Sequence, residues 1–244
     1  MNVSGSAYPP AEWEHSPFRQ GIRDCLPTIL GYWSIGLAAG VVSRTAGLSP
    51  AEIGLMSLIL YAGSAQFIVA GLVAASAPPA AIIATVFLVN ARHLLMSAAL
   101  APYFKHLSGW KNAALGVLLT DETFGVASSR LAGRTLASGR WMFGLNLAAY
   151  LNWFIANLTG ALLGNWITQP ERFGLDFALV AMFLGLLVLQ LAERSAYLRD
   201  LPVAAAAVLA VTASVLVMPQ SVGIFAAIVA AACVGVWLER WTSA

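Results

Sequence analysis

The sequence is poor in charged residues. Asp, Glu, Lys and Arg together make up 10% of its 244 residues, whereas 59% are hydrophobic and the mean hydropathy is +0.78. A soluble domain carries roughly 25% charged residues, so this composition excludes an ordinary soluble fold. In hydrocarbon every backbone N–H and C=O must be satisfied internally, which leaves α-helices or a closed barrel.

Other absences narrow the function. The two cysteines, Cys25 and Cys233, lie near opposite ends of the chain without a CxxC pair, so neither a disulfide framework nor a zinc site is indicated. No run of Lys and Arg points to nucleic acid. The motifs HExxH, GxSxG, GxGxxG and the phosphate-binding P-loop are missing. We therefore predict no enzyme activity, no cofactor and no metal site.

Long apolar stretches dominate what is present. Runs of up to ~20 residues lack the alternation of a barrel strand, so the sequence predicts an all-α, polytopic membrane protein. Residues 1–24 form a predicted polar tail, and residues 25–244 a single transmembrane helical domain. The seven or eight hydrophobic segments lie at about 26–43, 53–75, 80–100, 113–128, 142–167, 177–191, 201–218 and 222–238.

The segment at 113–128 is ambiguous. Its apolar part stops at Leu119, and two carboxylates follow at Asp121 and Glu122. It could span by burying these acids in the bundle, or it could enter and turn back. The distribution of Lys and Arg leaves orientation open, because eight crossings with an inside N-terminus and seven with an outside N-terminus both satisfy the positive-inside rule.

A shift of 120 positions suggests an internal repeat. It aligns Trp33 with Trp153 and Gly40 with Gly160, and gives six identities in the 23 positions from Trp33 to Leu55. Abundant Gly and Leu could produce some of these matches. If the repeat is real, the parity of crossings decides whether the copies are inverted or parallel.

Tryptophans mark predicted helix ends, where the ring favours the headgroup region. Trp33 and Trp153 lie deeper and are predicted to pack or to line a cavity. The predicted boundary tryptophans are Trp110, Trp141, Trp166, Trp237 and Trp241.

Placing a polar side chain within an apolar membrane segment costs free energy, so each such residue is expected to have a structural or functional role. The first cluster, at 61–67, contains Tyr61, Ser64 and Gln66 beside small residues that allow close backbone approach. This composition predicts a helix that breaks or packs tightly beside a cavity; an ordinary contact of small residues is the alternative.

The second cluster contains Asn90, Arg92 and His93. A permanently charged Arg92 must pair with a carboxylate, face water or contact an anion. His93 could relay protons, or could be a hydrogen-bonded core residue. Asn90 and His93 are predicted to share a helix face, with Arg92 pointing elsewhere.

Asp121 and Glu122 form the third cluster. One could neutralise Arg92 in a structural pair or a working site, and the other could carry a proton. The alternative is a solvated loop or helix terminus. A fourth group of polar residues is predicted mainly to hydrogen-bond between helices: Asn146, Asn152, Asn157 and Thr159.

These motifs together resemble the AzlC family, the large subunit of branched-chain amino-acid exporters. The resemblance runs from about Phe18 to the C-terminus. It rests on Gly21 to Pro27, Gly31, YAGSAQF at 61–67, NARHLLMS at 90–97 and TDETF at 120–124. It implies a multi-pass protein of the bacterial cytoplasmic (inner) membrane. It also implies proton-driven export of branched-chain amino acids and a small hydrophobic AzlD-type partner subunit.

Our hypothesis places an amino-acid zwitterion among interrupted helices in mid-membrane. Its carboxylate would meet Arg92 or a broken helix N-terminus, and its ammonium Asp121 or Glu122. Met96 and Phe67 would contact its side chain. The alternatives are a transporter of another small organic solute and a non-transporting membrane scaffold or assembly subunit.

Overall fold

The computed structural model is all-helical over the residues that it describes. These are 16–164, scattered positions between 166 and 188, and 197–217, 230 and 233–235. The predicted all-α class is therefore confirmed for this part of the chain. Two helical stretches in it, Pro17–Thr45 and Pro79–Phe104, are long and apolar enough to cross a membrane. The segment predicted at 222–238 lies almost wholly outside the described residues.

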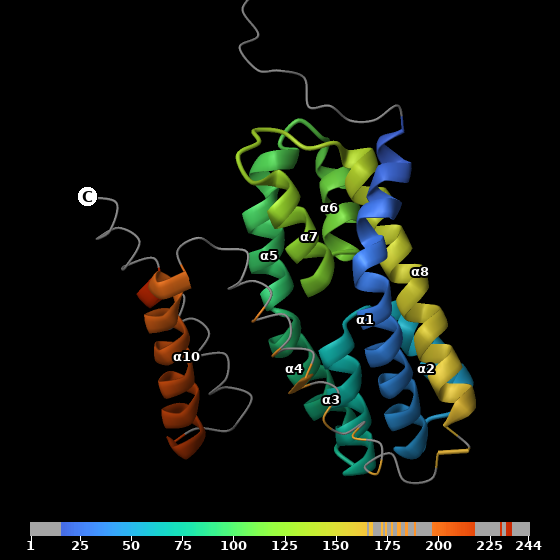
Figure 1. Ribbon diagram of the computed structural model, residues 1–244. Helices are drawn as coiled ribbons and strands as arrows, with labels where there is room; N and C mark the ends of the chain where they lie inside the picture. Colours follow the sequence, from blue (N-terminus) through green and yellow to red (C-terminus); the bar gives the residue numbers. More distant parts are fainter. Residues whose placement is uncertain are drawn as a thin grey trace, which may run out of the picture.

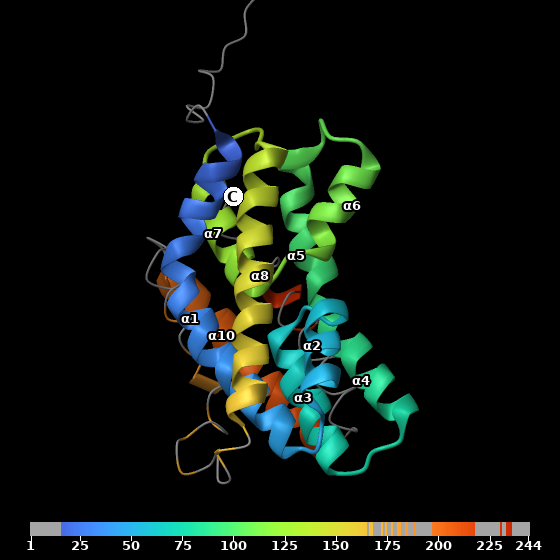
Figure 2. The same ribbon diagram turned by 90° about the vertical axis from the view of Figure 1, so that its right-hand side faces the viewer.

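Helices α1 (Pro17–Thr45) and α8 (Gly139–Leu163) lie side by side and run in the same direction (Figures 1 and 2). Glycines make this contact: a Cβ added to Gly40 would overlap the carbonyl oxygen of Asn157, and one added to Gly160 would overlap that of Leu37. The missing side chains let the two backbones touch. Helix α1 begins inside the segment predicted as a polar tail, because Pro17 suits the first turn of a helix.

Helices α2 (Pro50–Ile59) and α3 (Gly63–Ala74) form a hairpin. Ser49 and Glu52 cap the start of α2 reciprocally, and the chain breaks where Ala62 is extended. The start of α2 and the end of α3 lie at the same end of the bundle (Figure 1). The hydrophobic segment 53–75 is thus a re-entrant hairpin, and the break predicted near 61–67 is present.

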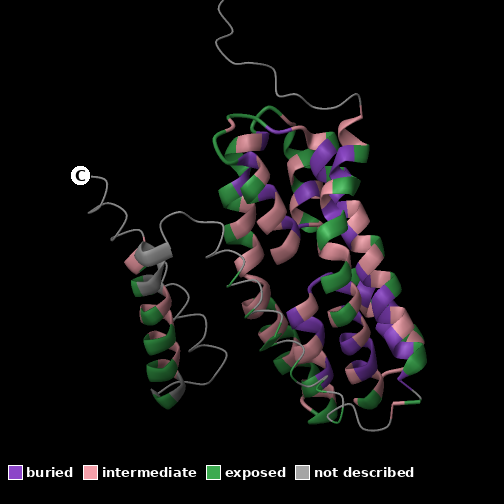
Figure 3. Cartoon of the chain, viewed as in Figure 1, coloured by how far each residue is buried: buried purple, intermediate pink, exposed green. Residues whose placement is uncertain are grey.

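Helices α4 (Pro79–Asn90) and α5 (Arg92–Leu100) run from one end of the bundle to the other, with an interruption at Ala91. A short 3-10 helix, η1 (Ala101–Phe104), continues α5. None of the residues of α4 is buried, and Figure 3 shows the buried residues concentrated instead around α1, α3 and α8.

Helices α6 (Gly109–Val117) and α7 (Asp121–Leu131) form a second hairpin that enters from the opposite end. Asn112 of α6 donates to the carbonyl of Phe104, and Arg130 of α7 lies 3.7 Å from Asp24, so both ends of the hairpin lie near the start of α1. The ambiguous segment at 113–128 is therefore part of two helices that reverse direction rather than one continuous helix. Its reversal at 118–120 is fixed by the capping box of Thr120 with Thr123.

Two of the predicted hydrophobic segments are thus helical hairpins rather than single continuous helices. Helix α10 (Tyr197–Val217) stands apart from helices α1 to α8 in Figure 1. Of the boundary tryptophans, Trp110 and Trp166 are exposed, but Trp141 is fully buried. Trp141 does lie at a helix end, in the first turn of α8, where its indole donates to Asp24 of α1 at 2.8 Å.

We predict that Gly160→Val destabilises the protein, because the new side chain must push α1 away from α8. Overpacking of this kind costs about 1–3 kcal/mol. Thermal unfolding of the purified protein in detergent, followed by circular dichroism, measures the loss. The matched control is Gly71→Ala in α3, where an added Cβ has nothing within 4 Å. Equal stability of both variants would contradict the close contact between the helices.

Candidate functional site

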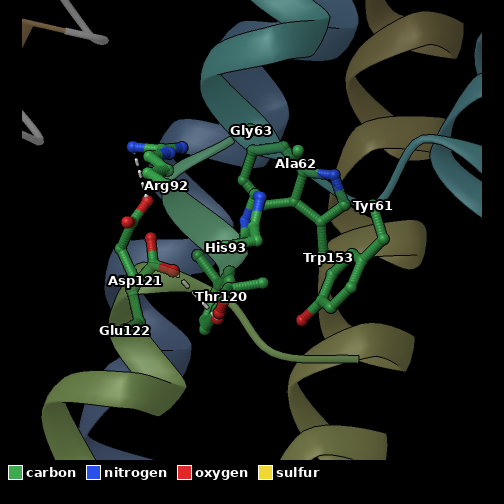
Figure 4. A pocket seen from close by; sticks show the side chains of 10 residues that line it. Tyr61, Ala62, Gly63, Arg92, His93, Thr120, Asp121, Glu122 and Trp153 are labelled. Atoms are coloured by element: carbon green, nitrogen blue, oxygen red, sulfur yellow. Dashed lines mark hydrogen bonds and ion pairs between the residues drawn. The ribbon is translucent and has the colours of Figure 1, made fainter. Parts of the chain in front are cut away.

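Three interruptions of the helices converge in the middle of the bundle. They are the tip of the α2–α3 hairpin, the break between α4 and α5, and the tip of the α6–α7 hairpin, which meet around Tyr32 and Trp153. The central cavity between them has a volume of about 10 Å³, which is room for about one water. Its lining is Tyr32, Tyr61, Ala62, Gly63, Arg92, His93, Thr120, Asp121, Glu122 and Trp153 (Figure 4).

Arg92 joins the tips of both hairpins. Its Nη1 lies 2.9 Å from Oδ2 of Asp121 on α7, and its Nη2 donates to Oγ of Ser64 on α3 at 2.6 Å. The side chains of the ion pair are 19% and 18% exposed, so solvent screens them little. Of the roles predicted for Arg92, pairing with a carboxylate is the one that this geometry confirms.

The neighbouring carboxylate, Glu122, has a different environment. It accepts a hydrogen bond from the Tyr32 hydroxyl at 3.1 Å, and that hydroxyl also lies 2.6 Å from Oγ1 of Thr120. No basic side chain among the described residues forms an ion pair with Glu122. The adjacent acids therefore differ: Asp121 pairs with Arg92, whereas Glu122 accepts a hydrogen bond from the Tyr32 hydroxyl and has no basic partner among the described residues.

His93 and Arg92 both line the central cavity. His93 also lines the groove that Asn90 lines and Arg92 does not, so the predicted shared side of Asn90 and His93 is present and Arg92 faces away from Asn90. Nδ1 of His93 lies 3.2 Å from the carbonyl oxygen of Asn90. Asn90 itself lines an adjacent apolar groove instead, and its buried side-chain oxygen has no hydrogen-bond partner in the described part of the chain.

Ser64 and Gln66 lie behind the cavity rather than in its wall. Ser64 contacts the site through Arg92. Gln66 is fully buried, donates to the carbonyl of Leu60, and accepts hydrogen bonds from Trp153 and Asn157. These two predicted pathway residues thus support the site from the α3 side.

An aromatic wall completes the cavity. The rings of Tyr32 and Trp153 meet edge to face with centroids 6.0 Å apart, and Tyr61 lines the same space. Met96 and Phe67, predicted for this role, do not line the cavity. Tyr32 was missed because a single tyrosine in an apolar helix resembles a packing residue, whereas Trp153 was predicted to pack or to line a cavity.

The polar series of α8 bridges helices as predicted, with one exception. Asn146 donates to the carbonyl of Leu115 at 3.0 Å, Asn152 donates to that of Ile29 at 3.4 Å, and Asn157 donates to Gln66. Thr159 donates to Ile155 in its own helix, so the interhelical role is wrong for this residue.

The described residues contain no group of three or more His, Cys, Asp and Glu side chains that could hold a metal ion. What the cavity offers is charge of both signs, hydroxyls and aromatic surface within one enclosed space. Such a set is suited to binding a small polar molecule rather than to nucleophilic or metal chemistry.

Comparison with known proteins places this arrangement in a family. The model of the AzlC protein family matches residues 27–167, which include every residue of the central cavity. The chain belongs to the AzlC family. No solved structure matches it.

Relatives of this AzlC chain are named as membrane or transport proteins. It is 30% identical over 176 residues to the inner membrane protein YgaZ of Escherichia coli, covering 70% of this chain and 72% of the relative. It is 25% identical over 173 residues to the branched-chain amino acid transport protein AzlC of Bacillus subtilis, covering 71% and 67%. An uncharacterized membrane protein of Archaeoglobus fulgidus is 32% identical over 183 residues, with 72% and 77% coverage. These matches support a transporter and indicate no catalytic family.

We predict that the Arg92–Asp121 pair is energetically coupled. Arg92→Gln and Asp121→Asn should each destabilise the protein, whereas the double variant should lose less than the sum, with a coupling free energy of about 0.5–3 kcal/mol. Thermal unfolding of the four proteins measures it. The control is the double variant of Arg92→Gln with Glu52→Gln, where Glu52 is exposed. Its loss of unfolding free energy should equal the sum of the two single losses. Additivity of the Arg92–Asp121 cycle would contradict the ion pair.

Proposed function

We propose that this AzlC-family protein exports branched-chain or related apolar amino acids across the cytoplasmic membrane of a bacterium. The central cavity is the binding site for the zwitterion. Support comes from the family and from the relative named as a branched-chain amino acid transport protein. The observation that carries the proposal is the opposite charge character of the two hairpin tips that face each other across this cavity.

The tip of the α2–α3 hairpin is the electropositive wall. Helix α3 starts at Gly63 after Ala62, which provides no side-chain cap, so first-turn N–H groups are available to an anion. Arg92 lies against Ser64 in the same turn. The substrate carboxylate binds here, where the helix dipole and the guanidinium act together.

The tip of the α6–α7 hairpin is the electronegative wall. Thr120 caps α7, and its first turn carries Asp121 and Glu122. Since Asp121 is paired with Arg92, Glu122 is the carboxylate that receives the substrate ammonium. The buried Tyr61 hydroxyl, which lacks a hydrogen-bond partner among the described residues, is a further polar group for the ligand.

An apolar groove of about 660 Å³ adjoins the cavity and shares Tyr61, Ala62 and His93 with it. This volume has space for an aliphatic side chain. Pockets that are mostly apolar and carry a few polar groups favour amphipathic ligands of this kind. Its apolar lining includes Ile59, Val86, Phe87, Val117 and Leu119.

Transport requires the hairpin tips to separate. The cavity holds about one water, so an amino acid enters only when Arg92 releases Ser64 or Asp121. Glu122 cannot hold a proton and a substrate ammonium together. Protonation of Glu122 after release of the substrate therefore couples inward proton movement to export, with His93 in the same cavity as a second proton carrier.

A small hydrophobic AzlD-type subunit completes the proposed exporter. Residues on α4 and α5 expose large apolar side chains, among them Ile83, Phe87 and Leu94. Since these side chains also line the groove, lipid and the subunit cover its open side in the membrane.

We propose that the two halves are parallel copies. Gly40 touches Asn157 while Gly160 touches Leu37, and each contact becomes the other on a shift of 120 positions. The same shift aligns the sequence of α10 (Tyr197–Val217) with the sequence of α4 and α5. Parallel α1 and α8 support copies related by an axis along the membrane normal.

The structure also supports an orientation with the N-terminal end of α1 in the cytoplasm. Within residues 16–164, Arg44 is the only basic residue at the opposite end, and Arg92 is central. Because both hairpins return to the end they enter from, the remaining basic residues collect beside the N-terminus of α1, as the positive-inside rule requires of the cytoplasmic face. They are Arg19, Arg23, Lys105, Lys111, Arg130, Arg134 and Arg140.

We predict that Glu122→Gln lowers leucine or valine flux at least about tenfold, because the variant has no charge for the substrate ammonium or the coupled proton. Flux is measured by counterflow in proteoliposomes that contain the protein and its partner subunit. The matched control, Glu52→Gln at the exposed start of α2, should transport like the unmodified protein.

Two results would overturn parts of this proposal. Full flux in Glu122→Gln excludes the ammonium site and its coupling role. Flux for other solutes but not for apolar amino acids changes the substrate, and the absence of any substrate-dependent flux with the partner present favours the scaffold alternative.

We predict that a cysteine at exposed His106 is labelled by an impermeant maleimide only after cells are permeabilised, whereas one at exposed Thr45 is labelled in intact cells. Each cysteine is introduced separately into a chain whose native cysteines have been replaced. The reverse pattern would place the N-terminus outside.

A further inference from the structure

Gln66 makes three side-chain hydrogen bonds next to the central cavity, yet it does not line it. The residue is fully buried in the first half of α3. Its Nε2 donates to the carbonyl of Leu60 at 2.6 Å, while its Oε1 accepts from Nε1 of Trp153 at 3.2 Å and from Nδ2 of Asn157. One amide thus connects the hairpin tip to two side chains of α8.

The Leu60 carbonyl needs such a partner. Leu60 follows the last residue of α2, where helical hydrogen bonding ends, and the chain reverses over the next two residues. The carbonyl accepts from the N–H of Ala62 at 2.9 Å and from Gln66. The amide of Gln66 therefore fixes the backbone of the tip that borders the cavity.

Trp153 receives its position from the same amide. The far edge of the indole packs on the tip: a Cβ added to Gly63 would lie 2.9 Å from Cη2 of Trp153. One face of the cavity is this ring, held edge to face against Tyr32. The hydrogen bond from Nε1 to Gln66 decides how far the ring reaches toward the tip.

We infer that Gln66 is a positioning residue that closes the central cavity, because it holds the Trp153 ring and the tip of the α2–α3 hairpin against each other. Without this amide the ring and the tip separate, and the enclosed space opens. The inference that Gln66 affects how the substrate fits rests on the proposed function. The inference that Gln66 closes the cavity does not depend on that function.

Only a glutamine-like group can fill this role. The amide offers an acceptor oxygen to two donors of α8 and an N–H to Leu60 at the same time. Methionine has a similar length and is apolar, so Gln66→Met removes these bonds with little change in volume. Trp153→Phe removes the indole donor and so breaks the link from the other side.

The closing role is tested without substrate by the reactivity of a cysteine at Ala62, which is buried and lines the cavity. Ala62→Cys is placed in a full-length chain whose Cys25 and Cys233 have been replaced. The rate of labelling by a small methanethiosulfonate reagent is then compared with and without Gln66→Met. We expect labelling at least about tenfold faster in the Gln66→Met protein, and a similar increase with Trp153→Phe.

The matched control is Asn146→Leu. Asn146 is also a fully buried amide of this bundle, and it donates to the Leu115 carbonyl of the other hairpin without lining the cavity. Labelling of Ala62→Cys should be unchanged in this variant. Equal labelling with and without Gln66→Met overturns the inference, and so does an equal increase in Asn146→Leu, which would mean general loosening. If Gln66→Met does not fold, Asn157→Leu, which removes a donor to Gln66 at a residue outside the cavity lining, decides by the same comparison.

Flux measurements separate this inference from the proposed function. In proteoliposomes, Gln66→Met should raise the leucine concentration needed for half-maximal flux about tenfold more than Asn146→Leu does, with a smaller change in maximal rate. Unchanged half-saturation with faster labelling would limit Gln66 to closure. If no variant transports any amino acid, the proposed function fails while the labelling result still decides the role of Gln66.

Discussion

Unsatisfied backbone groups are the constraint on which this structure depends. A helix that stops within hydrocarbon leaves N–H and C=O groups without partners, and such ends are tolerated only where protein or a cavity satisfies them. Here several helices stop in the same region, and nearby side chains serve their ends: Thr120 caps α7, and Gln66 donates to the carbonyl of Leu60 at the end of α2. The cavity exists because these interruptions share one place between α1 and α8.

The charge arrangement follows from the same convergence. Arg92 starts α5 and reaches both hairpin tips, so one guanidinium neutralises Asp121 and bonds Ser64. This leaves Glu122 beside Tyr32 and Thr120 without a cation among the described residues. A neutral pair next to a single carboxylate and an uncapped helix N-terminus presents charge of both signs, which is the property that a zwitterion requires.

Sequence reasoning succeeded where the signal was local. The break near Tyr61, the pairing of Arg92 with a carboxylate, and the bridging by Asn146, Asn152 and Asn157 all follow from the cost of polar groups in an apolar environment. It failed where position depended on a distant partner. Gln66, predicted for the pathway, lies behind the cavity because it bonds Trp153 and Asn157 of α8, and Met96 and Phe67 do not line the cavity.

The sequence by itself determined the helical class, the AzlC resemblance and the set of polar residues to be accounted for, because composition and motifs act over a few neighbouring positions. The tertiary structure decided that the segments at 53–75 and 113–128 turn back, that Gln66 lies behind the cavity, and that Tyr32 lines it. The last two outcomes depend on contacts between segments about 90 residues apart, Gln66 with Trp153 and Tyr32 with Thr120, which no local pattern encodes.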